Sequence, residues 1–145
     1  MDMATILLVE DNRDDVELTL HALRKNGMGN NVVVVRDGQE ALDYLFASGT
    51  HAGRHANATP DLVLLDLNLP KISGLDVLRA IRADPRTKRI PVVILTTSDD
   101  QADILGGYDL GTNSYVRKPV DFDEFYATVK ELETFWLALN TPPPR

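Results

Sequence analysis

The stretch ILLVEDNRDD, from Ile6 to Asp15, joins a short apolar run directly to a dense group of acidic residues. The apolar run does not alternate with polar residues, as is typical of a strand covered on both faces of a parallel sheet. Carboxylates this close in the chain repel one another. A fold therefore has to neutralise them with a cation or direct them into water.

The composition limits the class of protein. The chain has 145 residues, enough for one ordinary domain, and 43% of them are hydrophobic. Its formal net charge of −7 argues against a nucleic-acid surface, which needs Lys and Arg at phosphates. It has no cysteine, no apolar run of membrane-spanning length and no basic start like that of a signal peptide. We therefore expect a cytoplasmic protein that binds neither nucleic acid nor a membrane.

Short apolar runs alternate with amphipathic segments along the chain. The expected strands are residues 5–9, 32–35, 62–65, 92–95 and 115–116. The expected helices are a segment carrying Val16, Leu20 and Leu23, followed by residues 38–46, 75–81, 101–110 and 122–139. This alternation predicts right-handed crossovers and an α/β fold, a doubly wound parallel sheet within one domain at 1–140. Residues 141–145 would form a short proline-rich tail.

Polar side chains follow four of the five expected strands. In a doubly wound sheet, ligands bind beyond the carboxyl ends of the strands, where these side chains would gather. They are Glu10 and Asp11 after the first strand, Asp66 after the third, Thr96, Thr97 and Ser98 after the fourth, and Lys118 after the fifth. Glu10, Asp11 and Asp66 could hold a hard cation, and Mg²⁺ suits carboxylates together with backbone carbonyls and waters. Asp14 and Asp15 need no metal, because the first turn of the next helix favours negative charge and lies near water.

Each of these features also has an ordinary structural explanation. Asp11 or Asn12 could simply cap the following helix, and Asp66 could be a loop residue. Lys118 could be a surface lysine, and Thr96 could merely end a strand. Polar groups of complementary kind follow four of the strands. A single functional site explains this better than four unrelated structural roles do.

The residues at this edge suit phosphoryl transfer. A carboxylate can act as a nucleophile and form an acyl phosphate, and Asp66 is the candidate because its strand should be central. A cation held by Asp11, the ammonium of Lys118 and the hydroxyl of Thr96 could each contact a phosphoryl oxygen. No glycine-rich turn follows the first strand, so we expect the phosphoryl group to arrive on another molecule.

From Thr5 to about Leu139 the chain strongly resembles the receiver domains of two-component response regulators. The resemblance rests on LLVEDN, DLVLLDLNLP, SGLDVL, IPVVILTT and SYVRKPVD, which as a set are highly specific. It implies the flavodoxin-like receiver fold, with five parallel strands in order 2-1-3-4-5 and five helices. It also implies a phosphoacceptor signalling protein rather than an enzyme, whose only catalysis is its own phosphorylation and dephosphorylation.

The resemblance assigns the acidic residues of the expected site. Asp66 would be the phosphoacceptor. Asp11 and Asp66 would bind Mg²⁺ directly, together with the backbone carbonyl of Asn68. Glu10 would contact the same ion through water.

The resemblance also assigns the residues after the fourth strand and around the fifth. Lys118 would contact the phosphoryl group, and the peptide bond between Lys118 and Pro119 would be cis. Thr96 would be the switch hydroxyl. Tyr115 would be the aromatic residue whose rotamer reports phosphorylation to the outer face.

The segment between Phe46 and Pro60 is longer than in most receivers, and we expect a loop or a frayed helix extension there. This insertion, LTTSDD after the fourth strand and ETFWLAL in the last helix resemble the response regulators paired with bacterial and cyanobacterial phytochromes. A sensor histidine kinase of the phytochrome type would then be the phosphoryl donor. His51 and His55 lie in the insertion, and two histidines without further ligands favour solvated loop residues over a metal site.

The last expected helix carries more apolar surface than one stripe needs. A stripe at three-four spacing, predicted to face the core, contains Phe122, Phe125, Val129, Leu132, Trp136 and Leu139. Tyr126, Phe135 and Leu137 fall outside it. Excess apolar surface is typical of an interface. We therefore expect a homodimer through this helix, the helix at 101–110 and the fifth strand.

The favoured hypothesis is a stand-alone receiver that signals by docking. Phosphorylation of Asp66 by a histidine kinase would alter the face formed by the fourth and fifth helices. A phosphate-independent scaffold is one alternative. A Mg²⁺-dependent phosphatase with an aspartyl-phosphate intermediate is another, although Asp66-Leu67-Asn68 lacks the second aspartate that would serve as general acid.

Overall fold

The computed structural model describes residues 4–25, 31–54 and 58–144. Five parallel strands form one sheet in the order β2-β1-β3-β4-β5. The strands are β1 (Thr5–Val9), β2 (Asn31–Val35), β3 (Leu62–Leu65), β4 (Val92–Thr96) and β5 (Ser114–Arg117). The α-helices are α1 (Arg13–Lys25), α2 (Gly38–Leu45), α3 (Gly74–Ala83), α4 (Gln101–Asp109) and α5 (Phe122–Thr134). The predicted receiver fold and its strand order are therefore confirmed.

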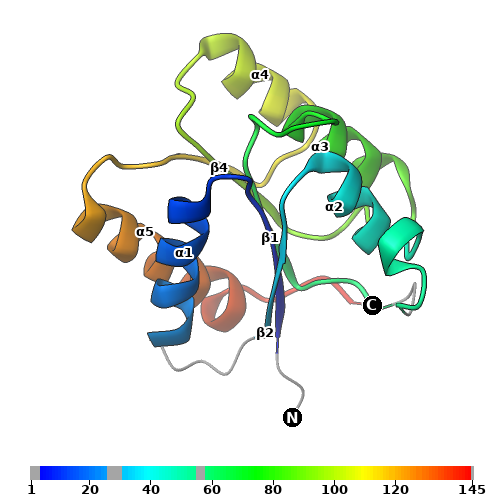
Figure 1. Ribbon diagram of the computed structural model, residues 1–145, viewed down its shortest axis with the longest axis horizontal. Helices are drawn as coiled ribbons and strands as arrows, with labels where there is room; N and C mark the ends of the chain where they lie inside the picture. Colours follow the sequence, from blue (N-terminus) through cyan, green and yellow to red (C-terminus); the bar gives the residue numbers. More distant parts are fainter. Residues whose placement is uncertain (1–3, 26–30, 55–57, 145) are drawn as a thin grey trace.

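The helices cover both faces of the sheet. Helices α1 and α5 lie on one side, and α2, α3 and α4 lie on the other (Figure 1). Successive strand residues point to opposite faces, so Ile6 and Leu8 pack with α1 and α5 while Leu7 and Val9 pack with α2 and α3. Burial on both faces explains why the strands are continuous apolar runs rather than alternating ones.

Side-chain caps set where four helices begin. The carboxylates of Asp37, Asp100 and Asp121 accept backbone N–H groups in the first turns of α2, α4 and α5, and the Ser73 hydroxyl does the same for α3. Helix α3 is three residues longer than the predicted segment 75–81, because Ser73 caps it one residue earlier and it continues to Ala83.

The last helix reaches Leu139 as predicted, but its final turn is irregular. The segment η2 (Phe135–Leu139) is π-helical. Phe125 and Val129 are buried as the stripe predicted, whereas Phe122 is 53% and Leu139 is 71% exposed. Both residues lie at the ends of the helical segment, outside the buried cluster that α5 forms with α1 and the sheet. The predicted core-facing stripe is therefore wrong at its two ends.

The insertion after α2 is anchored to that helix. A short 3₁₀ turn, η1 (Gly49–His51), follows α2. The Arg54 guanidinium donates to the carbonyls of Tyr44, at 2.6 Å, and Leu45, at 3.1 Å, and stacks over the Tyr44 ring. His51 is half-buried and its Nε2 lies 3.2 Å from Glu40 Oε2, so the expected solvated His51 is wrong. The anchored turn brings it back over α2; His55 lies outside the described residues.

No helix within residues 4–25, 31–54 and 58–144 is long and apolar enough to cross a membrane.

Candidate functional site

The parallel register brings the predicted site residues to one edge of the sheet. Val9 pairs with Leu65, so Glu10 and Asp66 leave neighbouring strands side by side. The backbone N–H of Asp66 donates to the carbonyl of Val9 at 3.0 Å. On the other side of β3, the backbone N–H of Lys118 donates to the carbonyl of Thr96 at 2.7 Å. The strand ends therefore place carboxylates, a hydroxyl and an ammonium within one small region.

The ammonium of Lys118 is directed at three carboxylates. Its Nζ lies 2.8 Å from Asp15 Oδ2 and 3.4 Å from Asp66 Oδ2, and it also donates to Glu10 Oε1. The side chains of Lys118, Glu10 and Asp66 are almost completely buried. An ammonium has three N–H donors, so each of them has one carboxylate partner.

The Asp66 carboxylate is held in a defined orientation. Its Oδ1 accepts the backbone N–H of Leu67 at 2.7 Å, and its Oδ2 faces Lys118. Asp66 follows β3, the central strand of the sheet. The predicted nucleophile is therefore a buried carboxylate, oriented by one backbone donor and one cation.

The site is short of positive charge. Burial, reinforced by the charge of Asp66, raises the pKa of Glu10 to about 7, although a hydrogen bond from Lys118 opposes the change. Burial by itself lowers the pKa of Lys118, but hydrogen bonds to Asp15 and Glu10 and the nearby carboxylate charges raise it above its usual value. Glu10 and Lys118 thus both hold protons more tightly than they would in water.

The acidic residues fit a divalent cation. Glu10, Asp11 and Asp66 each offer an oxygen, and these oxygens lie within 4.8 Å of one another. Asp11 is exposed, which leaves one side of the group open to water. Hard oxygen donors with an open side suit an ion that keeps part of its hydration shell. Asn68 is exposed two residues after Asp66, and its carbonyl as a further ligand stays a prediction.

The predicted switch residues are connected through Ser98. Thr96 is completely buried, and its hydroxyl accepts the backbone N–H of Ser98 at 3.4 Å. The Tyr115 hydroxyl donates to the carbonyl of the same Ser98 at 3.0 Å. The Ser98 hydroxyl donates to Asp103 of α4 at 2.7 Å. Ser98 therefore joins the site to β5 and to α4, a connection that the sequence did not predict.

The predicted cis bond between Lys118 and Pro119 is wrong. No peptide bond within the described parts of the chain is cis. The amide before a proline prefers trans by only about 0.5–1 kcal/mol, so the local sequence does not decide the isomer. With the trans bond, the Lys118 backbone still bonds Thr96 and its side chain still reaches the carboxylates.

Asp15 is a site residue that the sequence placed in water. It is half-buried and pairs with Lys118, contrary to the expectation of a solvated residue in the first turn of the helix. One signal could have found it. Thr19, Ala22 and Leu23 are buried residues of α1, and Asp15 precedes them at helical spacing on the same inward face.

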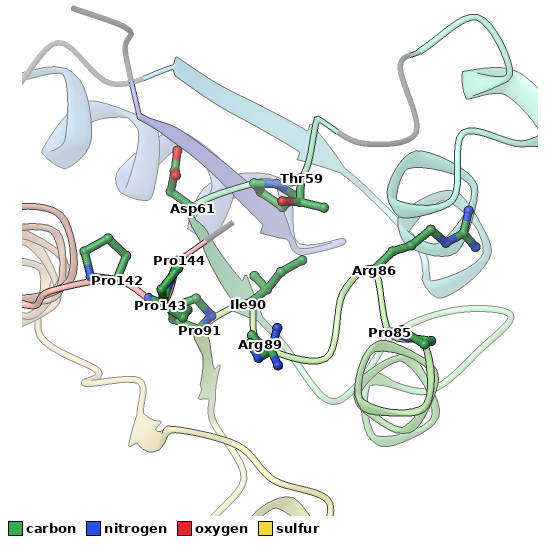
Figure 2. A pocket seen from close by; sticks show the side chains of 11 residues that line it. Thr59, Asp61, Pro85, Arg86, Arg89, Ile90, Pro91, Pro142, Pro143 and Pro144 are labelled. Atoms are coloured by element: carbon green, nitrogen blue, oxygen red, sulfur yellow. The ribbon is translucent and has the colours of Figure 1, made fainter.

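A separate pocket lies far from these residues. It is at the amino ends of β3 and β4, where the proline tail passes Pro91 (Figure 2). Its lining contains six prolines, Ile90, Arg86, Arg89, Thr59 and Asp61. None of the candidate site residues contributes to it, so it is not part of the acidic site.

Residues 6–130 match the family model of the response regulator receiver domain. The chain belongs to this family. This receiver is 38% identical over 138 residues to the response regulator Rcp1 of Synechocystis, covering 95% of this chain and 92% of Rcp1. It is 41% identical over 142 residues to the probable methanogenesis regulatory protein FilR2 of Methanothrix harundinacea, covering 98% and 89% of the two chains.

Solved structures of receivers are also similar. The phosphorylated cyanobacterial phytochrome response regulator RcpA superposes with a TM-score of 0.92 at 45% identity, over 99% of this receiver and 100% of that chain. The Mn²⁺-bound form of Rcp1 superposes with a TM-score of 0.90 at 38% identity, over 97% and 99%. The resemblance to response regulators of the phytochrome type is thereby confirmed.

Proposed function

We propose that this receiver accepts a phosphoryl group on Asp66 from the phosphohistidine of a sensor histidine kinase. The observation that carries the proposal is the Asp66 carboxylate itself. It is buried at the end of the central strand, oriented by the Leu67 N–H, and faces the ammonium of Lys118 at 3.4 Å. A nucleophile needs this combination of fixed orientation and nearby positive charge.

The transfer exchanges one bond to phosphorus for another. A carboxylate oxygen of Asp66 attacks the phosphorus, and an O–P bond forms as the P–N bond to the donor imidazole breaks. The electron pair of the broken bond stays on the imidazole nitrogen. Lys118 is placed to pair with a phosphoryl oxygen. Thr96 ends β4, the strand beside β3, and its hydroxyl would be a second partner.

We assign Mg²⁺ as the cation of the site. Asp11 and Asp66 would bind it directly with the carbonyl of Asn68, and Glu10 would bind through water. Such an ion supplies charge that stabilises the transferring phosphoryl group. Support comes from the oxygen-only donor set and from the surplus of negative charge around Lys118.

The kinase would dock on the apolar residues that follow Lys118. Val120 is fully exposed and Phe122 is half exposed, and both follow closely after Lys118 in the chain. Phe122 also lines a shallow hollow with Leu18 and His21 of α1. Exposed apolar residues beside a reactive carboxylate suit a partner that must bring its histidine to Asp66. The similarity to RcpA supports a kinase of the phytochrome type as this partner.

The output would be a change in the face formed by α4, β5 and α5. Thr96 and Tyr115 both contact Ser98, so a phosphoryl group that draws the Thr96 hydroxyl toward Asp66 would disturb this connection. Leu105 and Tyr108 of α4 and Phe135 and Leu139 of η2 are exposed apolar residues. We propose that a second copy of this chain covers part of this surface as a homodimer.

The test is the mass of the intact protein after incubation with acetyl phosphate, with and without Mg²⁺. We expect a single Mg²⁺-dependent phosphoryl adduct that is absent from Asp66→Asn. Asp61→Asn is the matched control, because Asp61 precedes the same strand at its opposite end. Labelling of Asp66→Asn equal to that of the wild type would refute the assignment of Asp66.

A further inference from the structure

Asp15 makes a shorter contact with Lys118 than the phosphoacceptor does. Asp15 Oδ2 lies 2.8 Å from Lys118 Nζ, compared with 3.4 Å for Asp66 Oδ2. The two residues are 103 positions apart in the chain. The contact therefore depends on how α1 is seated against the sheet.

The backbone around Asp15 fixes its position. Its N–H donates to Asn12 Oδ1 at 3.0 Å, and its carbonyl accepts the Thr19 hydroxyl at 2.7 Å. Its side chain is 24% exposed, so water reaches the carboxylate only in part. Asp15 thus offers Lys118 a carboxylate on a rigid helical turn.

Under the proposed function, Glu10 and Asp66, the other two partners of Lys118, each have a second role. Asp66 takes the phosphoryl group, and Glu10 would turn toward a water of the cation. Asp15 has neither role, because the group that can share a metal contains Glu10, Asp11 and Asp66 but not Asp15. When Glu10 and Asp66 change partners, Asp15 is the carboxylate still available to hold the ammonium in place.

We propose that Asp15 is a positioning residue that keeps the Lys118 ammonium beside Asp66 during phosphoryl transfer. This inference rests on the proposed function of Asp66. Asp15 acts through Lys118 and does not itself touch the phosphoryl group. Loss of its charge weakens one hydrogen bond of the ammonium and lets the flexible lysine side chain occupy other rotamers.

The variant Asp15→Asn tests the inference with Asp14→Asn as its matched control. Both substitutions remove one negative charge from the first turn of α1. Asp14 is exposed and has no ion-pair or hydrogen-bond partner within the described parts of the chain, so Asp14→Asn reports the effect of charge alone. Asparagine has nearly the shape of aspartate, and Asp15 is not a core residue, so both variants should fold.

Two measurements are made on the wild type and both variants. The first is the rate of phosphorylation by acetyl phosphate with Mg²⁺, followed by intact mass. We expect Asp15→Asn to be slower by about three- to tenfold, the effect of one charge-assisted hydrogen bond at a partly exposed site, and Asp14→Asn to stay within about twofold of the wild type. The second is the NMR signal of the Lys118 ε-methylene group in the metal-free protein, assigned with Lys118→Arg. It should shift in Asp15→Asn and stay in place in Asp14→Asn.

The outcomes separate the two proposals. Equal rates for Asp15→Asn and Asp14→Asn would overturn the positioning role of Asp15, as would a slower Asp15→Asn whose Lys118 signal does not move. A wild-type protein that takes no label would overturn the proposed function of Asp66, and this inference with it.

Discussion

The ammonium of Lys118 lies 3.4 Å from the carboxylate of Asp66, although the two residues are separated by 52 positions in the chain. They leave β5 and β3, with β4 between those strands. Thr96, which ends the intervening strand β4, is completely buried. The contact between Lys118 and Asp66 favours a functional site at the carboxyl edge of the sheet over a set of separate helix caps.

Replacing Lys118 by Met should slow phosphorylation by acetyl phosphate by about tenfold or more, because a charge-assisted hydrogen bond contributes about 1.5–3 kcal/mol. The variant also leaves Glu10 and Asp66 buried without their cation, so it should unfold at a lower temperature. Intact mass and thermal unfolding measure the two effects. Lys88→Met, at an exposed position, should change neither.

Glu10 should make stability depend on pH in the metal-free protein. The folded state raises the pKa of Glu10 from 4.5 to about 7, so the folded protein holds this proton more tightly than the unfolded chain does. The stabilisation is complete below pH 4.5 and is lost as the pH rises through about 7. The unfolding temperature of the wild type should therefore fall as the pH rises through this range, and that of Glu10→Gln should not. Identical pH profiles for the two proteins would contradict it.

Added Mg²⁺ should reverse that loss. A divalent cation binds the ionised carboxylates, so its stabilising effect should be small at pH 5.5 and larger at pH 8. Calorimetric titration should show proton release on binding near pH 6, and no such release in Glu10→Gln. A binding constant that does not change with pH would argue against Glu10 as a partner of the ion.

Substituting Val120 by Lys should reduce transfer from the cognate kinase by about tenfold, because a charge would enter an apolar contact surface. The rate with acetyl phosphate should change by less than about twofold, since Val120 is fully exposed and supports no part of the fold. Leu105 is an exposed apolar residue on α4, away from the proposed docking surface. The control variant Leu105→Lys should therefore leave transfer from the kinase unchanged. A loss with both donors would place Val120 in the chemistry instead of the docking surface.

Replacing Leu139 by Arg should shift sedimentation from dimer toward monomer. Leu139 is 71% exposed at the end of η2, so the change should leave the fold intact while placing a charge in the proposed interface. Val120→Lys, near the opposite end of the fold, should leave the sedimentation unchanged. A wild-type chain that sediments only as a monomer, with and without beryllofluoride, would remove the dimer from the proposal.

Tyr115→Phe should separate phosphorylation from its output. The variant loses the hydrogen bond to the Ser98 carbonyl but leaves Asp66 and Lys118 untouched. Labelling by acetyl phosphate should stay within about threefold of the wild type, because one neutral hydrogen bond contributes about 1 kcal/mol. The change in sedimentation on adding beryllofluoride should be lost. If Tyr115→Phe shows the same change in sedimentation as the wild type, the Tyr115 hydroxyl does not couple the site to the α4–β5–α5 face.

Much of the fold and site could be predicted from residue order. Apolar runs such as Leu62–Leu65 alternate with amphipathic segments, and this local pattern is enough to predict a doubly wound sheet. Because the sheet is parallel, Glu10, Asp66 and Lys118 had to meet at one edge. The family followed from the same residues.

The tertiary structure decided the contacts that depend on how the elements pack against one another. It also decided the isomer of the peptide bond between Lys118 and Pro119. Asp15 joins Lys118 because α1 turns that face inward, His51 meets Glu40 because the insertion folds back over α2, and Lys118–Pro119 is trans. Periodicity assigns a residue to a face of its own element, but an ion pair also requires a second element at the right distance. The pairing of Asp15 with Lys118 spans 103 positions, so it cannot be predicted from the order of residues. It forms only when α1 packs on the sheet.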